Sequence, residues 1–400
     1  MRVVSINAVP YGSTAGVMLG IMRAAEASGM ETHAFVGYSN HPHADIAKHN
    51  VIHGNALDKL VHILLGRFTG LNGCFSHYMT ARLIKTLDCC PPDIIHLHNL
   101  HGWYINLPML FRYIKKHNIP VVWTLHDCWP FTGHCSHFTF AKCDKWKTGC
   151  HHCPQYREYP QSLVDNSRIM YAFKKKWFTG VKNMTIVTPS QWLADLVKES
   201  FLKDYPVKVI HNGIDLEVFK PTPSDFRQRY GIPADKHILL GVAFGWGVRK
   251  GLDVFVELAK RLDSNRYQIV LVGTDDATDR QLPDSIISIH RTMDQTELAQ
   301  IYTAADLFVN PTREENYPTV NMEAIACGTP VLTFRTGGSP EIVDDTCGSV
   351  VDCDDVDALE QEIRWICGSS PYTKEACCAK AVQFDKNRRY QEYLELYDVM

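Results

Sequence analysis

Two carboxylates, Glu315 and Glu323, stand eight positions apart in the stretch EENYPTVNMEAIACGTPV. Pro318 between them suits the first turn of a helix, and Gly328 suits its end. We therefore expect Glu315 in a loop and Glu323 inside the helix that follows it. The N-terminus of a helix can bind a phosphate or a sugar hydroxyl. Acidic residues that only complement the helix dipole fit this spacing equally well.

Two cations, Arg249 and Lys250, precede a second helical pattern in the stretch GVAFGWGVRKGLD. Cations are disfavoured at a helix N-terminus unless an anion binds there. The order of residues does not fit a nucleotide P-loop. The pattern therefore favours an anion site of another kind.

Four cysteines lie close together in an insertion, with seven, six and two residues between them. They are Cys135, Cys143, Cys150 and Cys153. A C-x-x-C pair with two further thiols nearby suits tetrahedral zinc in a reducing compartment, and neighbouring histidines are alternative ligands. Free thiols and disulfides are the other interpretations. Any zinc here is expected to be structural, with no cofactor required for catalysis.

His126 ends the predicted strand 120–126, and Gly16 lies in the loop that follows the predicted strand 2–9. A histidine at a strand end can hold a sugar hydroxyl or move a proton, or it can be purely structural. The loop 11–16 suits close approach of the backbone to a ligand, for which Gly16 is the candidate. Alternatively, Gly12, Gly16 and Gly20 only permit tight packing of a helix against a sheet.

Apolar strands alternate with amphipathic helices along the whole chain, which predicts parallel sheets covered on both faces. The expected strands are 2–9, 31–38, 92–98, 120–126, 184–190, 207–215, 237–244, 267–273, 286–290, 306–312 and 330–334. The pattern restarts after the Pro-rich stretch 219–226. Such sheets bind ligands at the carboxyl ends of their strands.

The expected organisation is two Rossmann-like, doubly wound α/β domains that face a cleft. The acceptor domain covers 1–206 and carries the Cys-rich insertion 133–160. The donor domain covers 207–383, and the last segment, 384–400, is a helix that packs back on the first domain.

Composition excludes several classes of protein. With 45% hydrophobic and 21% charged residues and a net charge of −3, the chain is an ordinary globular protein with no nucleic-acid partner. The N-terminus is too short and polar for a signal peptide, which predicts a cytoplasmic protein. The helical pattern 57–68 is expected to pack in the core, and the run 174–178 to form a solvated face with Trp177 and Phe178 buried. Peripheral contact with the inner membrane face is the alternative for both.

A long composite motif closely resembles retaining glycosyltransferases of family 4, which have the GT-B fold. The stretch EENYPTVNMEAIACGTPVLTFRTGGSPEIV carries this resemblance, supported by NGID at 212–215, RKG at 249–251 and LHD at 125–127. The resemblance covers nearly the whole chain. It includes bacterial enzymes that build surface polysaccharides, among them the colanic-acid type.

The resemblance implies a nucleotide-sugar site in the second domain. Glu323 would bind the ribose hydroxyls, Glu315 would lie beside the transferred sugar, and Lys250 would neutralise the donor diphosphate. The implied catalytic residues are His126, Lys250 and Glu315. The implied donor-binding set is Gly16, Arg249, Lys250, Glu315, Asn316, Tyr317, Pro318, Thr319 and Glu323.

Two positions depart from the family pattern. Asn316 stands where the family more often has glycine, which bears on the donor hydroxyls that are recognised. Gly245 stands where the family commonly has arginine, and Arg249 is the expected substitute.

The expected function is transfer of a sugar of the hexose type to a hydroxyl of a glycan or lipid-linked acceptor, with retention, in polysaccharide biosynthesis. A nucleotide-sugar epimerase of GT-B fold is one alternative. A non-catalytic, zinc-stabilised protein that binds nucleotide or glycan is the other.

Overall fold

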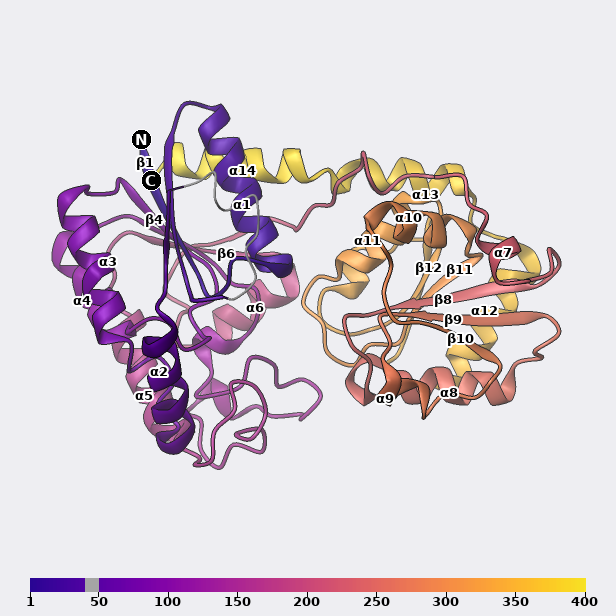
Figure 1. Ribbon diagram of the computed structural model, residues 1–400, viewed down its shortest axis with the longest axis horizontal. Coiled ribbons are helices and arrows are strands. Elements are labelled where there is room, and N and C mark those ends of the chain that lie inside the picture. The colour runs from indigo at the N-terminus through magenta and orange to yellow at the C-terminus, as the bar shows by residue number, and fades with distance from the viewer. Residues whose placement is uncertain (40–49) are drawn as a thin grey trace. The chain divides into compact units, whose positions relative to one another are not determined.

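The computed structural model describes residues 1–39 and 50–400, which divide into two compact units (Figure 1). Unit 1 consists of Met1–His211 together with Asn387–Met400, and unit 2 of Asn212–Lys386. Unit 1 thus extends to His211, whereas the sequence pattern predicted that the first domain ends at 206. The reason is that the segment after 206 adds a further strand to the first sheet.

Within the described residues, unit 1 holds a seven-stranded parallel sheet in the order β3-β2-β1-β4-β5-β6-β7. Its strands are β1 (Arg2–Asn7), β2 (Glu31–Val36), β3 (Asn50–His53), β4 (Ile94–Leu97), β5 (Val121–Thr124), β6 (Met184–Thr188) and β7 (Val207–Val209). The strand order reverses between β1 and β4. In a doubly wound sheet this reversal is where ligands bind.

The helices of unit 1 are α1 (Gly12–Ala27), α2 (Ala56–Thr69), α3 (His77–Cys89), α4 (Leu107–His117), α5 (Ser167–Phe178), α6 (Gln191–Glu199) and most of α14 (Lys386–Asp398). Short 3-10 turns occur at η2 (Trp129–Phe131) and η3 (Lys145–Lys147). The expected glycine-rich loop 11–16 is wrong in one respect, because helix α1 already begins at Gly12.

The C-terminal helix α14 is anchored in the core of unit 1 by its tyrosines. Tyr397 Oη lies 2.6 Å from Nδ1 of the buried His96 in β4. The other ring nitrogen of His96 lies 2.8 Å from Thr124 Oγ1, which also donates to Tyr393 Oη. A buried polar chain of this kind is stable only when each member has a partner. The last helix therefore completes the first unit.

Helix α2 does not pack as the sequence predicted. Its buried residues are His62 and Gly66, whereas its row of leucines is exposed. The expectation that 57–68 packs in the core is therefore wrong.

Unit 2 holds, among the described residues, a six-stranded sheet in the order β10-β9-β8-β11-β12-β13, and all its pairs are parallel. The strands are β8 (His237–Val242), β9 (Tyr267–Val272), β10 (Ile286–Ile289), β11 (Leu307–Asn310), β12 (Val331–Phe334) and β13 (Gly348–Val351). The last of these was not expected from the sequence.

Helices cover both faces of the second sheet (Figure 1). They are α7 (Phe226–Arg229), α8 (Leu252–Arg261), α9 (Asp276–Asp279), α10 (Gln295–Ala304), α11 (Thr319–Ala326), α12 (Val356–Ser369) and α13 (Lys374–Ala381), with short turns at η4 (Val248–Lys250), η5 (Ser339–Glu341) and η6 (Val382–Phe384). Helices α8 and α12 pack on one apolar cluster, and α10, α11 and α13 pack on the other.

Across residues 1–39 and 50–400, no helix is both long enough and apolar enough to cross a bilayer.

Candidate functional site

An ion pair joins two of the predicted site residues in unit 2. Lys250 Nζ lies 2.7 Å from Glu315 Oε2, and both side chains are largely shielded, with exposed fractions of 24% and 22%. Lys250 ends η4, which follows β8, and Glu315 lies in the loop after β11. Because β8 and β11 are parallel neighbours, their carboxyl ends meet and bring the two loops together.

Arg313 fixes these two loops against each other. Its guanidinium forms two hydrogen bonds of 2.8 Å to the carboxylate of Asp253 at the start of α8, and a third of 2.5 Å to Asp354. It also donates to the carbonyl of Val248, and its backbone N–H donates to the carbonyl of Arg249. Bidentate pairs of this kind are strong, and they also fix the relative orientation of the two side chains. Arg313 was not predicted from the sequence, because a lone arginine before two glutamates carries no periodic signal.

Two glycines permit the close backbone contacts of this site. At Gly251, a Cβ would lie 2.5 Å from the Pro311 carbonyl oxygen, and φ is +77°. At Gly337, with φ of +54°, it would lie 1.8 Å from the carbonyl oxygen of Glu315. Only glycine adopts both features without strain. The TGGSPE segment, residues 336–341, therefore packs closely against the loop that carries Glu315.

The start of α11 presents the predicted backbone segment, residues 316–319. Its N-cap is Pro318, whose side chain makes no capping hydrogen bond to this end of the helix. The Asn316 N–H donates to Glu315 Oε1 at 3.1 Å, and the Asn316 carbonyl accepts from the Gly338 N–H at 2.8 Å. Asn316, Tyr317 and Pro318 are buried and Thr319 is partly buried. An uncapped helix start suits an anion or a hydroxyl.

Glu323 lies inside α11, as predicted, and its partner is Tyr302, whereas Glu315 pairs with Lys250. The hydroxyl of Tyr302, from α10, donates to Glu323 Oε2 at 3.1 Å. Burial raises the pKa of Glu323 to about 7, against the opposing effect of hydrogen bonds from Tyr302 and Thr319. An ionised carboxylate here would accept hydrogen bonds from a pair of hydroxyls. Tyr302 was also missed, because a tyrosine in an amphipathic helix reads as an ordinary core residue.

Arg249 is exposed, unlike Lys250, and its backbone carbonyl accepts from Arg313. The structure thus places Arg249, Lys250, Glu315 and the start of α11 on loops at the same edge of the second sheet.

The predicted residues of unit 1 lie at the carboxyl edge of the first sheet. His126 follows β5, and its Nε2 lies 3.0 Å from Nδ1 of His98, which follows β4. The two rings are stacked with centroids 5.3 Å apart. Burial lowers the pKa of His126 to about 4, so its imidazole is neutral near pH 7. A neutral ring can both donate and accept a hydrogen bond.

The glycines of α1 serve different purposes. A Cβ at Gly20 would come within 2.4 Å of the Tyr390 ring, so Gly20 permits the packing of α14. A Cβ at Gly16 would meet nothing within 4 Å, and Gly16 is exposed. Packing therefore explains Gly20 and does not explain Gly16, for which the ligand interpretation stays a prediction.

The four cysteines of the insertion line one small cavity together with His134 and His151. Cys150 Sγ accepts a hydrogen bond from the Gly133 N–H at 3.1 Å, and Cys135 pairs with Cys153, which raises the pKa of Cys135. The buried amine of Lys174 lies nearby, donating to the carbonyls of Trp129 and Thr132. Burial lowers the pKa of this amine well below its usual value, and burial also raises the pKa of the Cys150 thiol to about 11.

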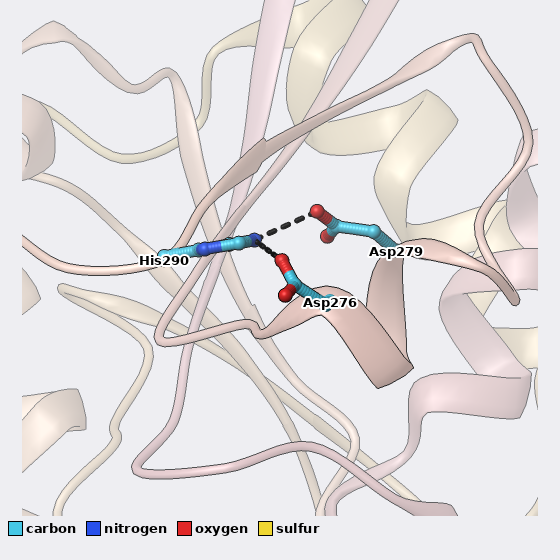
Figure 2. Close-up of side chains that lie close together, drawn as sticks. All are labelled: Asp276, Asp279 and His290. Atoms are coloured by element: carbon cyan, nitrogen blue, oxygen red, sulfur yellow. Dashed lines mark hydrogen bonds and ion pairs between the residues drawn. The ribbon is translucent and has the colours of Figure 1, made fainter.

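Asp276, Asp279 and His290 lie close together, with ligand atoms within 4.8 Å of one another (Figure 2). Among the described residues, the four cysteines do not form such a group. His290 Nε2 pairs with Asp279 at 2.7 Å, which raises the pKa of His290. This exposed trio is accounted for by its own ion pairs. The zinc site at the cysteines stays a prediction, and it requires the sulfurs to draw together around the metal.

Comparison with known sequences identifies the family. The profile described as Glycosyltransferase Family 4 matches residues 17–218, and the profile described as Glycosyl transferases group 1 matches residues 224–383. The first match alone spans half of the chain. The chain belongs to glycosyltransferase family 4 and is a nucleotide-sugar-dependent glycosyltransferase.

Two curated relatives illustrate the similarity. The chain is 25% identical over 379 residues to the "Putative colanic acid biosynthesis glycosyl transferase WcaC" of Escherichia coli strain K12, covering 90% of each chain. It is 29% identical over 195 residues to the D-inositol 3-phosphate glycosyltransferase of Mycolicibacterium smegmatis, covering 44% of each.

Solved structures confirm the GT-B fold. Sucrose-phosphate synthase from Thermosynechococcus elongatus matches with a TM-score of 0.74 at 19% identity, covering 100% of this chain and 98% of that one. Anabaena Alr3699/HepE in complex with UDP matches with a TM-score of 0.69 at 16% identity, covering both chains fully.

We predict that Gly337→Ala lowers the free energy of unfolding by at least about 2 kcal/mol, because its methyl group would collide with the Glu315 carbonyl. Urea denaturation measures this loss. The matched control is Gly368→Ala in α12, where a Cβ meets nothing within 4 Å and the variant should be neutral or slightly stabilised. Equal effects of the two substitutions would contradict the close fit of the TGGSPE segment.

Glu323 predicts a specific pH dependence of stability. The unfolded carboxyl ionises near pH 4.5, whereas the folded one keeps its proton to about pH 7. The wild type should therefore lose up to about 3 kcal/mol relative to Glu323→Gln as the pH rises through this window. Denaturation at pH 4.5, 6 and 7.5 measures the difference, with the exposed Glu375→Gln as control. Parallel curves for Glu323→Gln and wild type would contradict the raised pKa.

The cysteine cavity predicts about one zinc per chain by elemental analysis of protein purified without chelator. The variant Cys150→Ser/Cys153→Ser should lose the zinc, whereas Cys89→Ser/Cys90→Ser, which changes exposed thiols, should retain it. Normally folded wild type with almost no zinc would show the prediction to be wrong.

Proposed function

We propose that this glycosyltransferase moves a sugar from a nucleotide donor, with retention of configuration, to a hydroxyl of a glycan or lipid-linked acceptor in polysaccharide biosynthesis. The name of the E. coli relative supports the pathway class. The UDP carried by the Anabaena structure makes UDP-sugars the first donors to test.

The observation that carries the proposal is the Lys250–Glu315 pair beside the uncapped start of α11. A nucleoside diphosphate gains negative charge as its bond to the sugar breaks, so a fixed cation favours the transition state. The Lys250 ammonium has three donors and can keep Glu315 while it contacts a phosphate oxygen. Arg249, exposed on the same turn, supplies a second positive charge.

The remaining residues position the donor. In this proposal Glu323 accepts hydrogen bonds from the ribose hydroxyls, and the hydroxyl of Tyr302 orients its carboxylate. Glu315 and the backbone of residues 316–319 hold the sugar. His126 acts at the sugar or the acceptor as a neutral hydrogen-bonding group, consistent with its lowered pKa.

The reaction proposed is a front-side displacement. The acceptor hydroxyl oxygen bonds to the anomeric carbon on the face that the diphosphate leaves. The hydroxyl proton passes to the departing phosphate oxygen, so no enzyme carboxylate becomes covalently attached. Membership of a glycosyltransferase family argues against both an epimerase and a protein without turnover.

Thermal unfolding with UDP, GDP, ADP and their sugars tests the donor site. A nucleotide at about 100 times its dissociation constant should stabilise the wild type by roughly 2.7 kcal/mol. Lys250→Ala and Glu323→Ala should lose this shift, and Lys250→Ala should also lower kcat by roughly 100-fold or more. Lys260→Ala, an exposed lysine on α8, is the matched control.

Release of nucleoside diphosphate should require an acceptor. If no nucleotide stabilises the wild type, or if the variants respond as fully as the wild type, the donor site proposed here is wrong.

A further inference from the structure

Helix α2 presents its apolar side to solvent and its polar side to the protein. Six large apolar side chains, at spacings of three and four, have exposed fractions between 41% and 68%. They are Leu57, Leu60, Val61, Leu64, Leu65 and Phe68, and we call them the α2 surface. Water-soluble helices normally bury such a stripe. A contiguous exposed apolar patch of this kind marks a binding surface.

The inward side of α2 is fixed by specific contacts. His62 Nδ1 lies 2.8 Å from Ser76 Oγ, and its Nε2 accepts from the Gly73 N–H at 3.1 Å. Gly66 approaches the Trp103 ring so closely that a Cβ there would lie 3.3 Å away. A buried histidine with both nitrogens paired cannot be turned outward without leaving its partners unsatisfied. The helix is therefore held with its leucines outward.

The α2 surface continues onto the segment before α5. The Leu163 N–H donates to the Arg67 carbonyl at 2.8 Å, and Asn166 Nδ2 donates to the Thr69 carbonyl at 2.6 Å. These bonds hold Leu163 and Val164, which are also exposed, at the C-terminal end of α2.

Positive charge predominates on α2 and on the segment 162–178 that follows these contacts. Apart from the buried Lys174, residues 56–69 and 162–178 contain five lysines and arginines against two aspartates, in a chain whose net charge is −3. Arg67, Arg168, Lys175 and Lys176 are exposed. An exposed apolar stripe with basic neighbours is the pattern of a helix that lies in the interface of an anionic bilayer.

We propose that the α2 surface docks unit 1 onto an anionic lipid bilayer. The six side chains enter the boundary between headgroups and acyl chains, and Arg67, Arg168, Lys175 and Lys176 contact the headgroup phosphates. A symmetric pairing of two copies through this face would instead bring the same cations together, which is unfavourable. The inference goes beyond the proposed function and does not depend on it.

Vesicle flotation of the full chain tests this docking. We expect it to float with vesicles of phosphatidylcholine containing about a third phosphatidylglycerol, and much less with pure phosphatidylcholine. Leu64→Gln/Phe68→Gln should lower the partition at least about tenfold. Lys175→Ala/Lys176→Ala should weaken binding only to the anionic vesicles. The matched control is Trp365→Gln/Val382→Gln, which changes exposed apolar residues of unit 2 and should float as the wild type does.

Three outcomes would overturn the proposal. One is no flotation with any vesicle, and another is equal flotation of wild type and Leu64→Gln/Phe68→Gln. The third is a concentration-dependent dimer in sedimentation velocity that this variant abolishes, without vesicle binding, which would assign the face to a second copy. Circular dichroism and the nucleotide-dependent thermal shift show whether each variant is folded, and they keep this test separate from that of the donor site.

Discussion

The hydrogen bonds of Arg313 are the constraint on which the candidate donor site depends. This arginine joins the loop after β11 to the turn after β8 through Asp253, Asp354 and two backbone carbonyls. Lys250 and Glu315 belong to those two segments, so their 2.7 Å ion pair follows from the loops being held together. A site that must stabilise charge as it develops needs such preorganised groups, because reorientation during the reaction would cost free energy.

In each unit, burial favours the neutral form of a candidate site residue. Burial keeps the Glu323 carboxyl protonated to a higher pH and the His126 imidazole neutral to a lower one. In both cases desolvation disfavours the charged form. Both groups are therefore poised to bind hydroxyls through hydrogen bonds, while Lys250 and Arg249 supply the positive charge of the candidate donor site.

Much of the fold was predictable because the strands are short apolar runs separated by amphipathic helices. Two doubly wound units, the helix beginning after Pro318 and the family itself followed from that alternation and from the long motif around Glu315 and Glu323. Strand β13 was not expected. Strand β7 was expected as a strand but was placed in the second domain, whereas it pairs with β6 in the first sheet, because an apolar run does not show which sheet it joins.

The sequence by itself determined the class of enzyme and which residue types stand at the strand ends, because parallel sheets bring those ends to one edge. Only the tertiary structure decided their partners, such as Arg313 with Asp253 and Tyr302 with Glu323, which are separated by 60 and 21 positions. It also decided which side of α2 faces outward. The apolar period of that helix is the same whether the stripe is buried or exposed, and the contacts of His62 and Gly66 set the orientation.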